Sequence, residues 1–202
     1  IMAATNYDLI VGLEVHIQLN TKTKLFSNDT TVFGREANTQ TNEVSLAHPG
    51  VLPVLNEAAL EKAVKMGLAC NSIINREFYF DRKHYFYPDS PLGYQITQQN
   101  TPICLGGYVS IPTEDGEQEI ALEKIHMEAD AGKSIHDMDP AKSLVDLNRA
   151  GMPLLELVTK PVLTNIADVC RFVQEIQRIL RFTAIGDGNM EEVSLRFDDN
   201  IS

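Results

Sequence analysis

Hydrophobic and polar residues alternate along residues 9–19, with apolar Leu13, Val15, Ile17 and Leu19 interleaved with Gly12, Glu14, His16 and Gln18. A period of two predicts a β-strand with one apolar face and one polar face. Glu14 and His16 project from the same face of this strand, about 6.6–7 Å apart along it. The pattern therefore places a carboxylate and an imidazole side by side.

Two segments show helical spacing of apolar residues. Residues 57–70 follow Asn56, a favourable N-cap, and place Leu60, Ala63, Val64, Gly67 and Leu68 on one face. A second helix is predicted from a cap at Thr164 or Asn165 to about residue 182. Residues 20–50 are rich in Thr, Asn and Ser and lack a period, so we expect a long ordered loop with short strands there.

The remaining segments favour strands over helices. The pair Asp115-Gly116 is typical of a β-hairpin turn, and residues 130–140 predict a polar loop. The chain therefore predicts an α+β fold that is rich in strands, with two principal helices. The further strand candidates are residues 76–87, 93–99, 106–113, 118–128, 143–148 and 150–161, and a segment close to residue 202.

Composition and charge narrow the functional classes. The net charge of −11 argues against binding nucleic acid non-specifically through a whole face, although a local basic patch remains compatible with specific contact. Three widely spaced cysteines argue against a disulfide framework or a structural zinc site. No apolar run approaches the ~18 residues of a membrane helix. These features predict a cytoplasmic protein.

Several acidic and imidazole groups are candidates for a metal site. Glu14 and His16 are close enough to reach one divalent ion, and their chemistry leaves Mg²⁺, Mn²⁺ and Zn²⁺ open. An exposed strand face would explain the same pair without a metal. His126 and Glu128 share a face if their strand continues, and Glu156 needs a partner because it lies in an apolar strand.

Basic residues give a second set of candidates. Arg82 and Lys83 lie among aromatic residues, an arrangement that suits a nucleotide or phosphate, or simply a strand with solvated charges. Arg149 precedes Gly151 and is either an anion contact or a turn residue. Gly132-Lys133-Ser134 lacks the first glycine of a phosphate-binding loop, so we interpret this segment as a hairpin.

Seven motifs in order resemble the B-subunit family of the heterotrimeric tRNA-dependent amidotransferases (GatCAB). The resemblance covers residues 7–202. The motifs are GLEVHIQLNTKTKLFS, HPGVLPVLN, FDRKHYFYPD, GYQITQ, HMEADAGKS, DLNRAGMPLLE and DGNMEEVSLR.

The resemblance implies an ATP- and Mg²⁺-dependent ligase that phosphorylates the side-chain carboxylate of Glu-tRNA(Gln) or Asp-tRNA(Asn). Ammonia from a glutaminase A subunit then displaces the phosphate, and a C subunit completes the complex. The family fold is a cradle-type, mainly antiparallel domain, of which residues 1–202 would be a single catalytic part, truncated at its C-terminal end and without the helical and tail tRNA-binding domains. The implied metal ligands and catalytic residues are Glu14, His16, Glu128 and Glu156, and Arg82, Lys83 and Arg149 are implied in binding nucleotide or substrate.

The chain departs from the family pattern at two positions of the implied ammonia channel. Leu92 stands where the family usually has Lys, and Ala129 stands where it usually has Glu, whereas Lys83 is retained. A non-catalytic docking module for the glutaminase is the alternative function. A stand-alone metal hydrolase is disfavoured because no nucleophile or metal-water signature is apparent.

Overall fold

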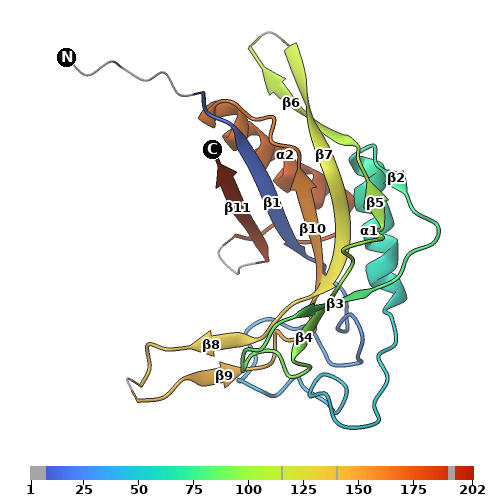
Figure 1. The fold of residues 1–202 in the computed structure, drawn as a ribbon, viewed down its shortest axis with the longest axis vertical. Coiled ribbons are helices and arrows are strands. Elements are labelled where there is room, and N and C mark those ends of the chain that lie inside the picture. The colour runs from blue at the N-terminus through green and yellow to red at the C-terminus, as the bar shows by residue number, and fades with distance from the viewer. Residues whose placement is uncertain (1–7, 115, 140, 191–193) are drawn as a thin grey trace.

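The computed structural model describes residues 8–114, 116–139, 141–190 and 194–202. Its main sheet contains β1 (Val11–Gln18), β2 (Ile73–Ile74), β5 (Cys104–Leu105), β6 (Tyr108–Thr113), β7 (Gly116–Ala129), β10 (Pro153–Thr159) and β11 (Leu195–Ile201). The strand order is β11-β1-β10-β7-β5-β2, and β6 pairs with β7 beside this path (Figure 1). Every pairing in this sheet is antiparallel.

Two small sheets and two helices complete the described part of the chain. The helices are α1 (Glu57–Ala69) and α2 (Ile166–Thr183), and the small sheets pair β3 (Asp81–His84) with β4 (Tyr94–Thr97) and β8 (Lys133–Ile135) with β9 (Leu144–Asp146). This arrangement confirms the predicted α+β class with a mainly antiparallel sheet. None of the described helices combines the length and apolar character needed to cross a membrane.

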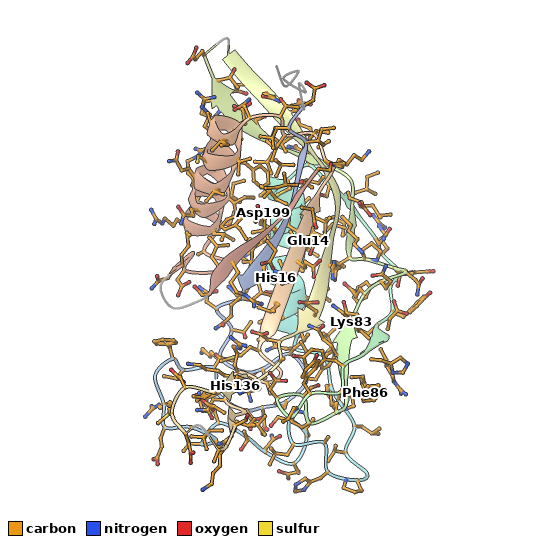
Figure 2. All side chains as sticks on the ribbon, turned by 60° about the vertical axis from the view of Figure 1, so that its left-hand side comes forward. Glu14, His16, Lys83, Phe86, His136 and Asp199 are labelled. Atoms are coloured by element: carbon orange, nitrogen blue, oxygen red, sulfur yellow. The ribbon has the colours of Figure 1, made fainter. Side chains whose placement is uncertain are left out.

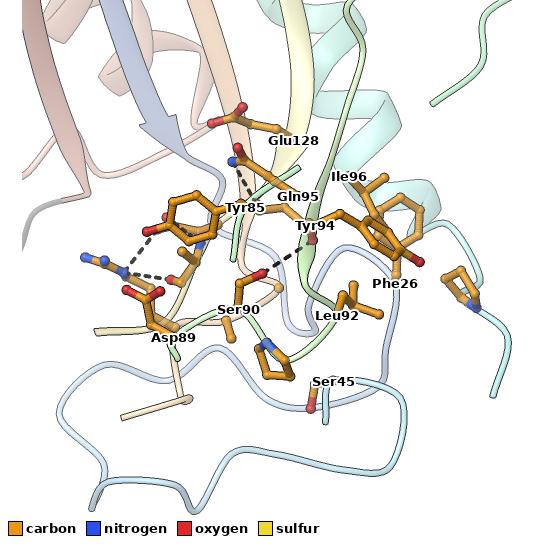
Figure 3. A pocket seen from close by; sticks show the side chains of 18 of the residues that line it. Phe26, Ser45, Tyr85, Asp89, Ser90, Leu92, Tyr94, Gln95, Ile96 and Glu128 are labelled. Carbon is orange, nitrogen blue, oxygen red and sulfur yellow. Dashed lines mark hydrogen bonds and ion pairs between the residues drawn. The ribbon is translucent and has the colours of Figure 1, made fainter. Parts of the chain in front are cut away.

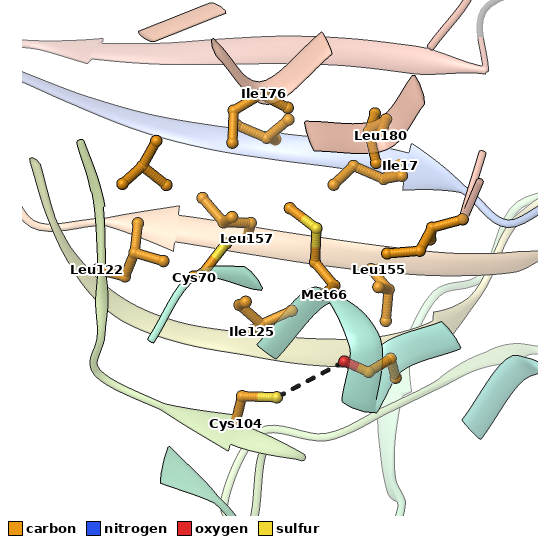
Figure 4. Packing of buried hydrophobic residues seen from close by; sticks show 14 of the residues in the cluster. Ile17, Met66, Cys70, Cys104, Leu122, Ile125, Leu155, Leu157, Ile176 and Leu180 are labelled. Atoms are coloured by element: carbon orange, nitrogen blue, oxygen red, sulfur yellow. Dashed lines mark hydrogen bonds between the residues drawn. The ribbon is translucent and has the colours of Figure 1, made fainter. Parts of the chain in front are cut away.

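Both helices pack on the same face of the main sheet. Ile17 of β1, Leu155 of β10 and Ile125 of β7 have no exposed surface, and they belong to one core with Met66 of α1 and Ile176 of α2 (Figure 4). Because side chains alternate along a strand, the neighbouring polar residues must project from the opposite face. The apolar face thus holds the sheet against the helices and leaves the polar face free for a site.

Both helices begin where the sequence predicts, each after an asparagine that caps its N-terminus. The Asn56 side chain accepts hydrogen bonds from the backbone N–H groups of Ala58 and Ala59, at 3.0 and 3.4 Å. Asn165 caps α2 by accepting from the backbone N–H of Asp168 at 2.8 Å. Each cap satisfies amide donors that have no partner within the helix.

Several strand predictions need correction. The predicted strand 76–87 contains only β3, because Phe78 and Phe80 pack edge-on against aromatic neighbours instead of extending the pairing with β4. The predicted loop 130–140 contains β8, which completes a hairpin with β9. The sequence also missed the two-residue strands β2 and β5. Asp115, of the predicted hairpin turn, lies outside the described residues, and β6 and β7 on either side of it pair as expected.

The loop over residues 20–50 is held in place by a buried lysine. Within this segment only an isolated bridge joins Thr23 to Thr30, so the short strands that we expected are absent from it. Lys24 Nζ donates to the backbone oxygens of Gln40, at 2.7 Å, and Leu147, at 3.3 Å, and its side chain has no exposed surface. Lys24 therefore ties the loop to the segment that leads into β10.

Burial lowers the pKa of Lys24 from 10.5 to about 8, and the negative charge of Asp29, whose carboxylate lies 3.9 Å away, opposes the change. At a pH between these two pKa values, Lys24 is protonated in the unfolded chain and deprotonated in the folded chain. We expect the free energy of unfolding to rise between about pH 8 and pH 10.5, by up to about 3 kcal/mol from this group.

Urea unfolding across this pH range checks the prediction by comparing the parent chain with Lys24→Met. Cys70 and Cys104 act in the opposite direction above pH 9, because burial raises the pKa of each thiol to about 12. The difference between the two curves isolates Lys24, and exposed Lys22→Met is the control. Parallel curves for the parent chain and Lys24→Met would contradict the prediction.

Candidate metal centre and adjoining pocket

Strand register brings one row of polar residues together on the face of the sheet away from the helices. Arg196 of β11 is opposite His16 of β1, His16 is opposite Glu156 of β10, and Glu156 is opposite His126 of β7. Glu128 lies two residues beyond His126, on the same face. Residues from four strands therefore meet on a single patch.

Three of these side chains form a compact group. Nε2 of His16 lies 3.4 Å from Oε2 of Glu156 and 3.7 Å from Oε1 of Glu128. Ligand atoms of all three residues lie within 4.8 Å of one another. One imidazole and two carboxylates from three neighbouring strands are thus within reach of a single ion.

The pKa values of the group reflect this crowding. Contact with Glu156 raises the pKa of His16 above its ordinary value, and burial opposes the increase. Burial favours the neutral acid at Glu156, yet contact with His16 and the proximity of His126 and Lys83 lower its pKa overall. The carboxylate is therefore held in the anionic form that binds cations.

The donor set fits a divalent cation. Carboxylate oxygens suit Mg²⁺ and Mn²⁺, and an imidazole nitrogen suits Mn²⁺ and Zn²⁺ better than Mg²⁺. Among the described residues, Nδ1 of His16 has no hydrogen-bond partner, and a carboxylate oxygen of Asp198 lies 3.4 Å from it. Such a carboxylate can orient a ligating imidazole through its second nitrogen.

Glu14 precedes His16 by two residues on β1 (Figure 2), but it is not part of the compact group. It is opposite Val158 of β10, and its Oε1 accepts a hydrogen bond from Nδ2 of Asn200 at 3.3 Å. The assignment of Glu14 as a ligand stays a prediction. His126, which shares a strand face with Glu128 but was not predicted as a ligand, has its Nε2 3.5 Å from Glu156 and 3.8 Å from Glu128.

A pocket of about 310 Å³ adjoins the metal group (Figure 3). His16 and Glu128 form part of its wall, and the small β3–β4 sheet supplies Lys83. Apolar side chains such as Phe26 and Ile96 line another part of it. The pocket thus combines an apolar surface with acidic, basic and imidazole groups, as ligand sites commonly do.

Arg149 is fixed by the backbone at the edge of this pocket. Its Nε donates to the oxygen of Ala131 at 3.1 Å, and its Nη2 donates to the oxygen of Gly132 at 2.8 Å. Nε also lies 3.3 Å from a carboxylate oxygen of Asp130, whose pKa burial raises to about 6 although Arg149 opposes the increase. The guanidinium is thereby held beside a pocket that adjoins the candidate metal group.

The two basic residues of β3 have different surroundings. Lys83 lines the pocket, whereas the guanidinium of Arg82 lies over the ring of Tyr94, 5.1 Å from its centroid. Adjacent residues of a strand face opposite ways, which explains the difference. The structure brings Lys83 and Arg149 to the pocket, and the assignment of Arg82 to ligand binding stays a prediction.

Known proteins resemble the chain along nearly its whole length. A family model described as the GatB/GatE catalytic domain matches residues 9–202. The chain belongs to this family. It is 50% identical over 196 residues to the B subunit of the aspartyl/glutamyl-tRNA(Asn/Gln) amidotransferase from Dichelobacter nodosus, an alignment that covers 97% of the chain and 41% of that relative.

Other relatives with the same description give a similar result. The B subunit from Pelagibacter ubique is 47% identical over 97% of the chain and 40% of the relative, and the one from Salinibacter ruber is 46% identical over 100% of the chain and 41% of the relative. The chain thus spans about two fifths of the length of these curated relatives.

The two positions that we expect to depart from the family pattern lie at the pocket. Leu92 and Ala129 both line it together with Lys83 and Glu128. Leu92 is 36% exposed and Ala129 is 9% exposed, and the Ala129 oxygen accepts a hydrogen bond from Gln95 Nε2 at 3.1 Å. Among the described residues, no carboxylate forms an ion pair with Lys83.

Glu156 belongs to the compact group and Glu14 does not. We therefore expect the same substitution, Glu→Gln, to weaken metal binding by different amounts at the two positions. Glu156→Gln should weaken Mn²⁺ binding at least about 100-fold, because it removes a charged ligand. Glu14→Gln removes the same charge from the neighbouring row and should weaken binding less than about tenfold. Isothermal titration with Mn²⁺, in the absence of nucleotide and tRNA, makes the comparison. Equal losses in the two variants would show that Glu14 is a ligand together with Glu156.

Proposed function

We propose that this domain is the kinase centre of a tRNA-dependent amidotransferase. It transfers the γ-phosphoryl group of ATP to the side-chain carboxylate of Glu-tRNA(Gln) or Asp-tRNA(Asn), and ammonia from glutamine then converts that group to an amide. The observation that carries the proposal is the position of the His16–Glu128–Glu156 group beside a pocket in a member of the GatB/GatE family.

The chemistry requires charge to be neutralised at this place. A carboxylate is a poor acyl donor, so its oxygen must first form a bond to the γ-phosphorus while the bond to the departing ADP breaks. Two anions approach each other in this step, and a divalent cation at the site supplies the compensating positive charge. His16, Glu128 and Glu156 would hold the cation.

Basic side chains would bind the phosphates and the substrate carboxylate. Lys83 and Arg149 lie at the pocket, and the backbone contacts of Arg149 restrict its movement. A fixed guanidinium is suited to binding carboxylate or phosphate oxygens. Arg82 does not line the pocket and would act from outside it.

The second step joins nitrogen to the activated substrate. Ammonia attacks the carbonyl carbon, the carbon–nitrogen bond forms, and the bond from carbon to the phosphate oxygen breaks with loss of one proton from nitrogen. The ammonia would come from glutamine through a partner glutaminase A subunit, with a C subunit in the same complex. The overall reaction is that of a carbon–nitrogen ligase with glutamine as amide donor.

The direct test substitutes one metal ligand in the complete subunit, assembled with its A and C partners. Glu156→Gln should reduce tRNA-dependent ATP cleavage at least about 100-fold, because transfer loses several kcal/mol of charge stabilisation. Glutamine hydrolysis measured without tRNA should persist. Transfer of ³²P from γ-labelled ATP to Glu-tRNA in the parent complex is the positive control. Absence of this transfer in the parent complex would favour a docking module for the glutaminase.

The changes at Leu92 and Ala129 predict weaker coupling between glutamine hydrolysis and amidation. Ammonia loses water contacts on entering a protein passage, so polar lining groups aid its transit. We expect fewer than one amide per glutamine hydrolysed, and an increase in Leu92→Lys with Ala129→Glu together. Either substitution alone should help less, because each supplies only one of the two charges, and an unpaired carboxylate at buried position 129 costs about 3–5 kcal/mol.

Free ammonium provides the control for this prediction, since it bypasses the passage and should support equal amidation in the parent complex and the double variant. A ratio near one in the parent complex, unchanged by the double substitution, would place the passage elsewhere or show that it needs no such charges.

A further inference from the structure

The imidazole of His126 is buried beside the metal group, but His126 is not one of the three residues of that group. The residue is 4% exposed, and its Nδ1 has no hydrogen-bond partner among the described residues. Its Nε2 lies 3.5 Å from Oε2 of Glu156 and 3.8 Å from Oε2 of Glu128. A buried polar ring with these neighbours is directed at both carboxylates.

The two imidazoles meet at Glu156, where Nε2 of His16 and Nε2 of His126 lie 3.4 and 3.5 Å from the same oxygen, Oε2. His16 and His126 are each opposite Glu156, on the two strands that flank β10. His16 lies nearer Oε1 of Glu128, whereas His126 lies nearer Oε2 of the same group. The two oxygens of Glu128 are therefore shared between the two rings.

The two rings differ in whether they belong to the compact group. Ligand atoms of His16, Glu128 and Glu156 are mutually within 4.8 Å, and His126 is not a member of this set of described groups. An ion held by that set would have His126 outside its ligands, with Nε2 near both carboxylates. Groups in this position orient metal ligands, and their loss typically costs about 10–100-fold in metal affinity.

We propose that His126 is a positioning residue of the metal centre: its Nε2–H, 3.5 Å from Glu156 and 3.8 Å from Glu128, holds both carboxylates toward an ion bound by His16, Glu128 and Glu156. The inference rests on the proposed function only in requiring a cation at this site. Metal binding measured without ATP or tRNA can succeed or fail independently of phosphoryl transfer.

Two variants of similar length separate positioning from packing. His126→Gln keeps an N–H donor near the place of Nε2, and His126→Met fills a similar volume without a donor. In the full subunit, Mn²⁺ affinity should fall about 10–100-fold in His126→Met and remain within about threefold of the parent in His126→Gln. His136→Met changes an exposed histidine and should leave Mn²⁺ affinity unchanged.

Electron spin-echo spectroscopy of bound Mn²⁺ distinguishes positioning from ligation by counting coupled nitrogens. One histidine nitrogen should be seen in the parent and in both His126 variants, and none in His16→Ala. Two nitrogens in the parent, with one lost on substitution of His126, would make His126 a ligand and overturn the proposal. Equal affinity in His126→Met and the parent, or equal weakening in His126→Met and His126→Gln, would also overturn it.

Circular dichroism and thermal unfolding of the metal-free proteins establish whether each variant is folded. If His126→Met is unfolded, His126→Asn replaces it, because the shorter side chain places its amide away from the position of Nε2. Its affinity should then fall below that of His126→Gln, and equal affinities in the two amide variants would contradict positioning through Nε2.

Discussion

The antiparallel register of β1, β10 and β7 is the constraint on which the site depends. It sets Glu156 between His16 and His126 and brings Glu128 into the same group. Two carboxylates with oxygens within 4.8 Å of each other repel by about 3–4 kcal/mol at an effective dielectric constant of about 20. Flanking imidazoles reduce this repulsion, and a bound cation would replace it with attraction.

The opposite face of the same strands keeps this arrangement in place. Ile17, Leu155 and Ile125 are completely buried against the helices, so a register shift of one residue would turn apolar side chains outward and the polar group inward. That exchange would be strongly unfavourable, because it would remove the apolar side chains of these strands from the core. Packing against α1 and α2 therefore specifies the spacing of groups that lie on the far side of the sheet.

The pocket depends on segments that are distant along the chain. Lys83 comes from the small β3–β4 sheet, Arg149 comes from the turn before β10, and Lys24 ties the loop over residues 20–50 to that turn. Backbone carbonyls hold both Arg149 and Lys24, which leaves the geometry of the pocket less dependent on exposed ion pairs. Surface ion pairs contribute little stability by comparison.

The sequence by itself determined the local features of this protein. Alternation along residues 9–19 specified the two faces of β1, and Asn56 and Asn165 marked the starts of α1 and α2, because such signals act between residues close in the chain. Through the resemblance of whole motifs to a family, it also placed His16, Glu128 and Glu156 in one group, together with Glu14. Only the tertiary structure decided that His126 lies against Glu128 and Glu156, that Arg82 lies over Tyr94 and that Glu14 bonds to Asn200. Strand partners and register are set by packing between distant segments.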